Sequence, residues 1–289
     1  MTQVFVRKAA YDPPLIRALV DDMLDSMGPD FIRPGSRVLI KPNLLLPAAP
    51  DKAIVTHPMI CRAVVQYVLN KGAQVQVSDS PGMGTFRKLV RETGYADALD
   101  DLDVVFKPFE ASVEVDIGPP FGRIPIAREA VEADLVINLA KLKTHAQMYL
   151  TLAVKNIFGC IVGLRKPEWH MRAGVDRMLF AQLIVQIYQA VSPGFTVVDG
   201  ILALEGQGPG KSGTPRQLGL IVAGDDGYAV DKTICTLLGL EPDRLLTCHQ
   251  ARALNLFNGE VRVNGDLRIV DDFVFPQLHS MSLDRKSVV

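Results

Sequence analysis

Short apolar runs alternate along the chain with segments in which apolar residues recur every three or four positions. The runs are typical of buried strands, and the recurring spacing is typical of amphipathic helices. The clearest runs are residues 3–7, 37–40, 74–78, 135–138, 195–198 and 217–223. The clearest helical segments are residues 13–27, 58–71, 178–191, 227–238 and 243–256.

Signals at the helix ends support this alternation. Asp12 precedes Pro13, and Thr56 or His57 precedes Pro58, so two helices begin with a capping side chain and a proline at the first position. Short connections in a strand–helix–strand order favour parallel strands. We therefore predict an α/β protein with a mostly parallel, Rossmann-like sheet and flanking helices.

Two regions are less regular. Residues 203–215 predict a long glycine-rich loop, and Asn264-Gly265, between VRV and LRIV, predicts a β-hairpin near the C-terminus. We treat residues 1–289 as a single domain. The alternative is two α/β lobes, residues 1–130 and 131–289, with the site between them.

Composition narrows the class of protein. Hydrophobic residues make up 48% and charged residues 22%, and the net charge is −1, so no global field attracts nucleic acid or an anionic membrane. The four cysteines form no Cys-x-x-Cys pair, and no apolar run is a clean membrane span. The first residues also lack the apolar run of a signal peptide. We expect a cytoplasmic protein without nucleic-acid or membrane partners and without an iron–sulfur cluster.

Polar residues follow two of the predicted strands at the point where each strand ends. Ligands collect beyond the carboxyl ends of parallel strands, so these residues are candidates for binding a substrate. A glycine-rich turn there leads into a helix, whose first N–H groups could hold an anion. Asp79 is a candidate metal ligand, or a cap of that turn. The substrate-binding candidates are Lys41, Asn43, Ser80 and Gly82.

The segment 134–166 places many donors and bases among apolar runs. A lysine that is desolvated or lies close to another cation has a lowered pKa and can act as a base, and a histidine can transfer a proton or bind a metal. The alternative is that the lysines extend to solvent and that the histidine is structural. The catalytic candidates are His145, Lys143 and Lys155; the substrate-binding candidates are Lys141 and Asn156; His145 is also a candidate metal ligand, with Asp79.

The segment EGQGPGKSGTP resembles the end of a phosphate-binding P-loop at Gly210-Lys211-Ser212. That motif requires glycine where residue 205 is glutamate, and it requires a following helix where a strand is predicted. We expect instead a flexible lid over the site, with a surface loop as the alternative. The lid residues are Gly206, Gly208, Gly210 and Lys211. Lys166 is placed at the rim of the pocket as a further substrate-binding residue, or in a solvated loop.

These features favour an enzyme that binds a small anionic molecule through lysines and transfers a proton through a histidine or a lysine. A divalent metal or a metal-containing cofactor could assist. The alternative is a non-catalytic redox-partner, cofactor-carrying or scaffold module whose lysines lie on a flat face. In either case the protein could form a homo-oligomer.

Seven segments in a fixed order resemble the domain-of-unknown-function family 362. Many members contain a ferredoxin-like segment with Cys-x-x-Cys-x-x-Cys runs, so this chain resembles the stand-alone form. The resemblance covers about residues 35–240 and implies no established reaction. The segments are KPNLL (41–45), THP (56–58), GAQVQVSDSPG (72–82), INLAKLKTH (137–145), TLAVKNIFG (151–159), VDG (198–200) and EGQGPGKSGTP (205–215).

A weaker similarity is to the lactate racemase family, which uses a tethered nickel-pincer cofactor. In that family a strand leads into a histidine and a lysine-containing apolar segment beside the active site. His145 and Lys155 are the residues of this chain that could correspond. The histidine pair at that family's base positions is not recognisable in this sequence.

Overall fold

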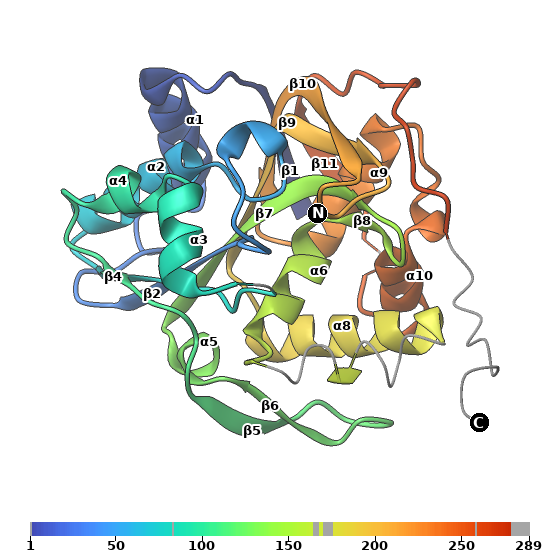
Figure 1. Cartoon of the computed structure of the whole chain (residues 1–289), viewed down its shortest axis with the longest axis horizontal. Coiled ribbons are helices and arrows are strands. Elements are labelled where there is room, and N and C mark those ends of the chain that lie inside the picture. Colours follow the sequence, from blue (N-terminus) through green and yellow to red (C-terminus); the bar gives the residue numbers. More distant parts are fainter. Residues whose placement is uncertain (1, 83, 164–167, 170–175, 258, 279–289) are drawn as a thin grey trace.

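The computed structural model describes residues 2–82, 84–163, 168–169, 176–257 and 259–278 (Figure 1). Its main sheet is built from strands of both halves of the sequence. Their bounds are β1 (Thr2–Lys8), β2 (Arg37–Pro42), β3 (Gln74–Val77), β4 (Val105–Phe106), β7 (Leu135–His145), β8 (Tyr149–Thr151), β9 (Phe195–Gly206), β10 (Gly213–Gly224) and β11 (Val261–Gly265). A separate two-stranded sheet pairs β5 (Ser112–Asp116) with β6 (Arg123–Ala127).

The strand order of the main sheet is β11-β1-β10-β9-β7-β2-β3-β4, and β8 pairs with β7. The strands from β9 to β4 are mutually parallel, whereas β10 is antiparallel to both of its neighbours. The predicted α/β fold with a mostly parallel sheet is confirmed. The division into lobes 1–130 and 131–289 stays a prediction.

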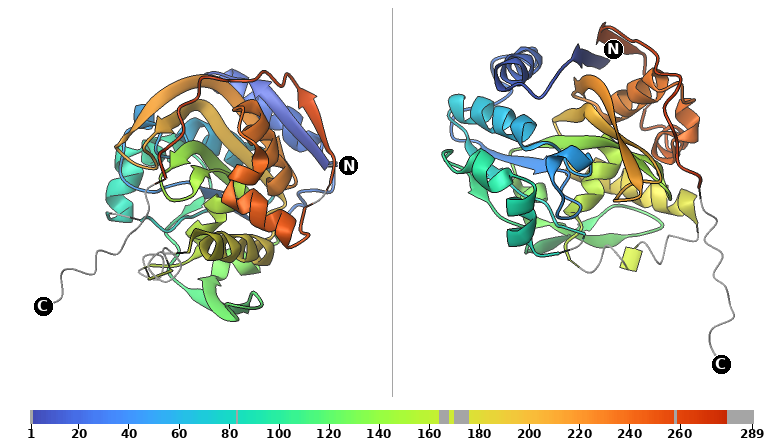
Figure 2. Two further views of the ribbon diagram at one scale, coloured as in Figure 1. Left: turned by 90° about the vertical axis from the view of Figure 1, so that its right-hand side faces the viewer. Right: turned by 45° about the horizontal axis from the view of Figure 1, so that its top comes forward.

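Helices lie on both faces of the sheet, as Figures 1 and 2 show. Side chains alternate between the faces along each strand: Val38 and Ile40 pack in one hydrophobic cluster, and Leu39 packs in another. The helices are α1 (Pro13–Asp25), α2 (Pro58–Asn70), α3 (Phe86–Glu92), α4 (Tyr95–Leu99), α5 (Arg128–Glu132), α6 (Ala153–Asn156), α8 (Arg177–Val191), α9 (Gly227–Leu237) and α10 (Leu246–Ala253). The buried faces of α1 and α2 pack against the first cluster, and α8 and α9 contribute to the clusters on the other face.

The predicted helix starts are confirmed. The Asp12 side chain accepts a hydrogen bond from the Leu15 N–H at 2.9 Å, and His57 Nδ1 accepts one from the Met59 N–H at 3.2 Å. Each bond satisfies one of the N–H groups that the first turn of a helix leaves without a partner. The cap of α2 is therefore His57 rather than Thr56.

Three local predictions were wrong in extent or pairing. The strand predicted at 135–138 continues to residue 145, because β9 and then β8 pair with its second half. Residues 203–215 belong largely to the β9–β10 hairpin, and only residues 207–212 connect the two strands. Asn264-Gly265 forms no hairpin turn: β11 ends there and pairs in parallel with β1.

Candidate functional site

A cavity of about 240 Å³ lies at the carboxyl ends of β2 and β3 and beside the second half of β7. Apolar side chains, among them Leu45 and Phe158, line part of its wall. Most of the polar residues that the sequence singled out meet here. The predicted site residues that line it are Lys41, Asn43, Asp79, Ser80, Gly82, Lys143, His145, Lys155 and Asn156.

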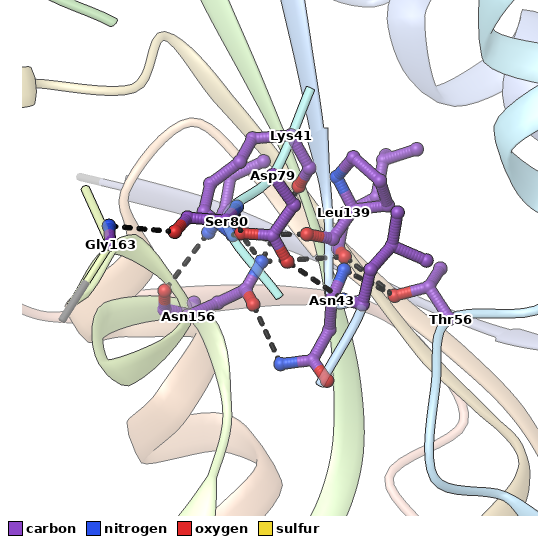
Figure 3. Close-up of polar contacts among 12 residues, drawn as sticks. Lys41, Asn43, Thr56, Asp79, Ser80, Leu139, Asn156 and Gly163 are labelled. Carbon is purple, nitrogen blue, oxygen red and sulfur yellow. Dashed lines mark hydrogen bonds and ion pairs between the residues drawn. The ribbon is translucent and has the colours of Figure 1, made fainter. Parts of the chain in front are cut away.

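Lys41 and Asp79 form a buried ion pair at one wall, with Lys41 Nζ 2.9 Å from Asp79 Oδ1 (Figure 3). The carboxylate also accepts hydrogen bonds from the Ser80 N–H and the Leu44 N–H, both at 2.8 Å. A Cβ on Gly159 would lie 2.5 Å from Lys41 Nζ, so only glycine allows the backbone to approach the pair this closely. Asp79 therefore joins the ends of β2 and β3 through contacts that occupy both of its oxygens.

Three asparagines form a directed chain of hydrogen bonds beneath the cavity. Asn138 Nδ2 donates to the Ala153 carbonyl at 2.9 Å, so Asn138 Oδ1 accepts from Asn156 Nδ2 at 2.7 Å. Asn156 Oδ1 in turn accepts from Asn43 Nδ2 at 2.8 Å (Figure 3). Because each amide fixes the orientation of the next, Asn43 must present its carbonyl oxygen at the end of the chain.

The group that Asn43 Oδ1 faces is the amine of Lys143. Lys143 Nζ donates to Asn43 Oδ1 at 2.8 Å and to the Ile54 carbonyl at 2.6 Å, and it makes no ion pair with the described residues. Its side chain is buried, and burial lowers the pKa of Lys143 well below the ordinary value of 10.5; the charges of Lys155 and Lys141 lower it further. Lys143 is thus a desolvated amine held between two neutral oxygens.

His145 lies at the end of β7, where its ring caps the turn to β8. Its Nδ1 accepts from the Gln147 N–H at 3.2 Å and from the Met148 N–H at 3.3 Å. An Nδ1 that accepts places the proton of the neutral ring on Nε2. The ring is therefore held as a neutral donor tautomer beside the cavity.

Asn156 and Lys155 are positioned by the short helix α6, which an acid from another helix caps. The Asp231 carboxylate accepts from the Ala153 N–H at 2.8 Å and from the Val154 N–H at 3.2 Å. Burial raises the pKa of Asp231 to about 8. Through these two hydrogen bonds α9 fixes the start of α6.

Lys141 does not line the cavity, although it was a substrate-binding candidate. Its Nζ lies 2.7 Å from Asp199 Oδ2, and both side chains are fully buried. The Tyr11 hydroxyl and the His57 N–H each donate to Asp199 at 2.9 Å, and the ring of Tyr11 stacks on that of His57 at 3.8 Å. Burial lowers the pKa of His57 to about 4. Lys141 therefore belongs to a separate buried network that joins β7, β9 and the start of α2.

The predicted lid forms the tip of the β9–β10 hairpin. Pro209 lines the cavity, whereas Gly210 and Lys211 line a neighbouring hollow and Gly206 ends β9. Gly208 donates to Thr144 Oγ1 at 3.1 Å and accepts from the Ala146 N–H at 3.0 Å, which ties the tip to β7. Closure over the cavity stays a prediction. Lys166 lies outside the described residues.

Two backbone N–H groups after β3, those of Ser80 and Gly82, donate within the protein. The Ser80 N–H donates to Asp79, and the Gly82 N–H donates to the Leu45 carbonyl at 2.9 Å. Helix α3 begins only after Thr85, whose side chain accepts from the Lys88 N–H. Ser80 and Gly82 thus shape the wall of the cavity without offering these two donors.

The predicted metal ligands do not form a larger cluster. Both oxygens of Asp79 and the Nδ1 of His145 take protein hydrogen bonds. Within the part of the chain that the structure describes, no three His, Cys, Asp or Glu side chains are grouped as metal ligands. Metal binding through His145 and Asp79 stays a prediction.

Sequence reasoning missed several residues that hold the site and the neighbouring buried network in place. Asp199 had the same signal as Asp79, an acid directly after a buried strand, and could have been found by it. Asp231 stands within the apolar pattern of a helix, which is a signal for a buried partner. Gly159 had no signal beyond its place in an apolar segment, because its role depends on the distant Lys41–Asp79 pair.

Comparison of the sequence with known proteins gives two findings. A family model described as Domain of unknown function (DUF362) matches residues 38–236. A relative named thylakoid-associated protein, from Synechocystis sp., is 37% identical over 253 residues, which is 87% of this chain and 78% of the relative.

No helix among the described residues is long and apolar enough to cross a membrane, and the cytoplasmic location stays a prediction.

Among solved structures, the chain is similar to the apoprotein of lactate racemase from Thermoanaerobacterium thermosaccharolyticum. The identity is 13% and the TM-score 0.46, over 70% of this chain and 51% of that one. This chain therefore spans about half the length of that structure. A similarity at this level indicates nothing about the reaction.

Proposed function

The chain belongs to the domain-of-unknown-function family 362, and we propose that its cavity binds a small anionic substrate from which Lys143, as a neutral amine, takes a proton. One observation supports this above the others. Three buried lysines lie in this region, and Lys41 and Lys141 each have a carboxylate partner within 3 Å. Among the described residues, Lys143 has only neutral acceptors. The lysine without a carboxylate partner is therefore the one whose neutral form these contacts favour.

The hydrogen bonds of Lys143 fit a neutral amine. A neutral amine has two N–H groups and one lone pair, and the two N–H groups are taken by Asn43 Oδ1 and the Ile54 carbonyl. The third position belongs to the lone pair, and Lys143 lines the cavity. An ammonium group has three donors, so it would need a further acceptor there. A bound anion meets that need once the proton has been transferred.

The same contacts favour proton transfer over formation of an imine with the substrate. An imine nitrogen keeps at most one hydrogen, so at least one of Asn43 Oδ1 and the Ile54 carbonyl would lose its donor. A buried polar group without a partner costs about 1–3 kcal/mol. Lys143 is therefore assigned as a base rather than as a nucleophile.

The charge and size of the cavity support a small anion as the ligand. Within the part of the chain that the structure describes, three lysines line it, and Asp79 is the one carboxylate among the lining residues, already paired with Lys41. Its volume of about 240 Å³ lies below the range of about 300–1,000 Å³ that is common for drug-sized ligands. The apolar wall at Leu45 and Phe158 suits a short hydrocarbon part. His145, a neutral donor tautomer, would hydrogen-bond the substrate or return the proton.

The non-catalytic alternative is less well supported. A scaffold that binds a partner's acidic surface needs exposed lysines on a flat face. Lys41 and Lys143 instead have at most 1% of their surface exposed, within a concave cavity. Burying an amine without a carboxylate is expensive, and no docking surface requires it.

Anion binding is the first test. We expect calorimetry at pH 7 to detect binding of at least one of acetate, butyrate, acetoacetate and inorganic phosphate. Replacing Lys155 by methionine should weaken that binding at least tenfold, since it removes a positive charge from the cavity.

The matched control is Lys88→Met, which removes an exposed lysine of α3 that pairs with Glu92. This variant should bind the anion like the wild type. The proposal is contradicted if none of the four probes binds to the wild type. It is also contradicted if both variants weaken binding of the anion equally.

A further inference from the structure

The hydroxyl of Thr151 is buried in the wall of the cavity without a hydrogen-bond partner. Thr151 ends β8 and is 3% exposed, and its Oγ1 contacts no donor or acceptor among the described residues. Threonines around the same strands differ: Thr56 donates to the Leu139 carbonyl, Thr144 accepts from Gly208, and Thr196 accepts from Asn138. A buried hydroxyl without a partner is destabilising in the free protein.

Thr151 lies directly opposite Lys143. The two residues are partners in the antiparallel β7–β8 register, and both line the cavity. Side chains at opposite positions of an antiparallel pair have Cβ atoms about 4.5–5.5 Å apart. One small ligand in the cavity can therefore contact both residues.

The turn that places Thr151 is held in an uncommon conformation. Tyr149, two residues earlier, has φ of 72°, a left-handed backbone that an aromatic residue rarely adopts. Its hydroxyl accepts a hydrogen bond from Arg244 at 2.5 Å, and its ring packs against Phe275. Backbone strain of this kind persists where the surrounding structure holds it, and it is concentrated at ligand sites.

We infer that Thr151 Oγ1 contacts the substrate, and that the substrate has a hydrogen-bonding oxygen or nitrogen beside the atom that faces Lys143, in addition to its anionic group. This rests on the proposed function, because it places the ligand of that same cavity. The substrate class is then a small bifunctional anion rather than a simple carboxylate. Thr151 becomes a specificity-determining residue.

The first arm of the test measures stability without ligand. Thr151→Val keeps the shape of the side chain and removes the orphan hydroxyl, so its midpoint of thermal unfolding should stay equal or rise by about 2–4 °C. The matched control is Thr144→Val, which removes a hydroxyl that accepts from Gly208 and should lower the midpoint. If the unfolding midpoint of Thr151→Val falls as far as that of Thr144→Val, the Thr151 hydroxyl has a structural partner and the inference is overturned.

The second arm measures specificity with two probes that share a four-carbon chain and a carboxylate. Acetoacetate has an additional carbonyl oxygen that butyrate lacks. The wild type and Thr151→Ser should bind acetoacetate at least fivefold more tightly than butyrate, and Thr151→Val should lose that preference while its affinity for butyrate is kept. An unchanged preference in Thr151→Val would overturn the inference. If the wild type binds no anion at all, the proposed function fails, and the stability arm still decides whether the hydroxyl has a structural partner.

Discussion

Replacing Lys143 by methionine should slow proton transfer strongly and leave the fold intact. Methionine fills a similar volume without a base, so exchange of substrate hydrogen with solvent should slow by about 10²–10⁴-fold, the usual contribution of a general base. The measurement is deuterium incorporation from D₂O into a small carboxylate that the wild type binds, followed by mass spectrometry.

Stability separates this result from simple unfolding. In Lys143→Met the Asn43 and Ile54 oxygens each lose one donor, but the variant also no longer buries an amine. We expect the free energy of unfolding to change by less than about 2 kcal/mol. Exchange at the wild-type rate, or a collapse of stability, would refute the assignment of Lys143 as a base.

Lys141→Met, the same substitution two residues earlier, should instead destabilise the fold. Lys141→Met should lower the free energy of unfolding by about 3–5 kcal/mol, because it leaves the fully buried Asp199 carboxylate without its cation. The remaining donors to Asp199, from Tyr11 and His57, do not neutralise its charge. Urea unfolding at pH 7 measures this loss.

A double variant provides the control. Lys141→Met combined with Asp199→Asn removes both charges, so it should recover part of the stability that Lys141→Met loses. The coupling free energy between the two positions should then be well above the deviations from additivity that independent sites show. Additive effects, or a Lys141→Met protein as stable as Lys143→Met, would contradict the assignment of the pair.

The sequence predicted the frame of the site because strand ends have a local signature. Lys41, Asn43 and Asp79 follow apolar runs of parallel strands, and the carboxyl ends of such strands meet at one edge of the sheet. Periodicity and turn residues alone therefore place these three residues at one edge of the sheet, whatever their individual partners are.

The difference between Lys141 and Lys143 could not be predicted in this way. Both lysines point to the same side of β7, and both are buried. Their difference depends on β9, which places Asp199 beside Lys141, and on the loop after β2, which places only neutral oxygens beside Lys143. Such contacts join residues about 60 to 100 positions apart in the chain.

The errors in the prediction have similar causes. The apolar run predicts a strand only over residues 135–138, but pairing with β8 and β9 extends it to His145. The Asn264-Gly265 turn signal was overridden because β11 finds its partner in β1, at the other end of the sequence. In both cases pairing with another strand overrode the local sequence signal.

The pKa of Lys143 tests the central claim most directly. The side-chain resonances of isotope-labelled lysine, followed by NMR from pH 5 to 11 and assigned with Lys143→Met, should show Lys143 losing its proton well below the ordinary value of 10.5. Because the unfolded chain keeps that proton to higher pH, wild-type stability should also rise relative to the variant as pH increases through this interval. Titration of Lys143 at or above 10.5 would contradict the account.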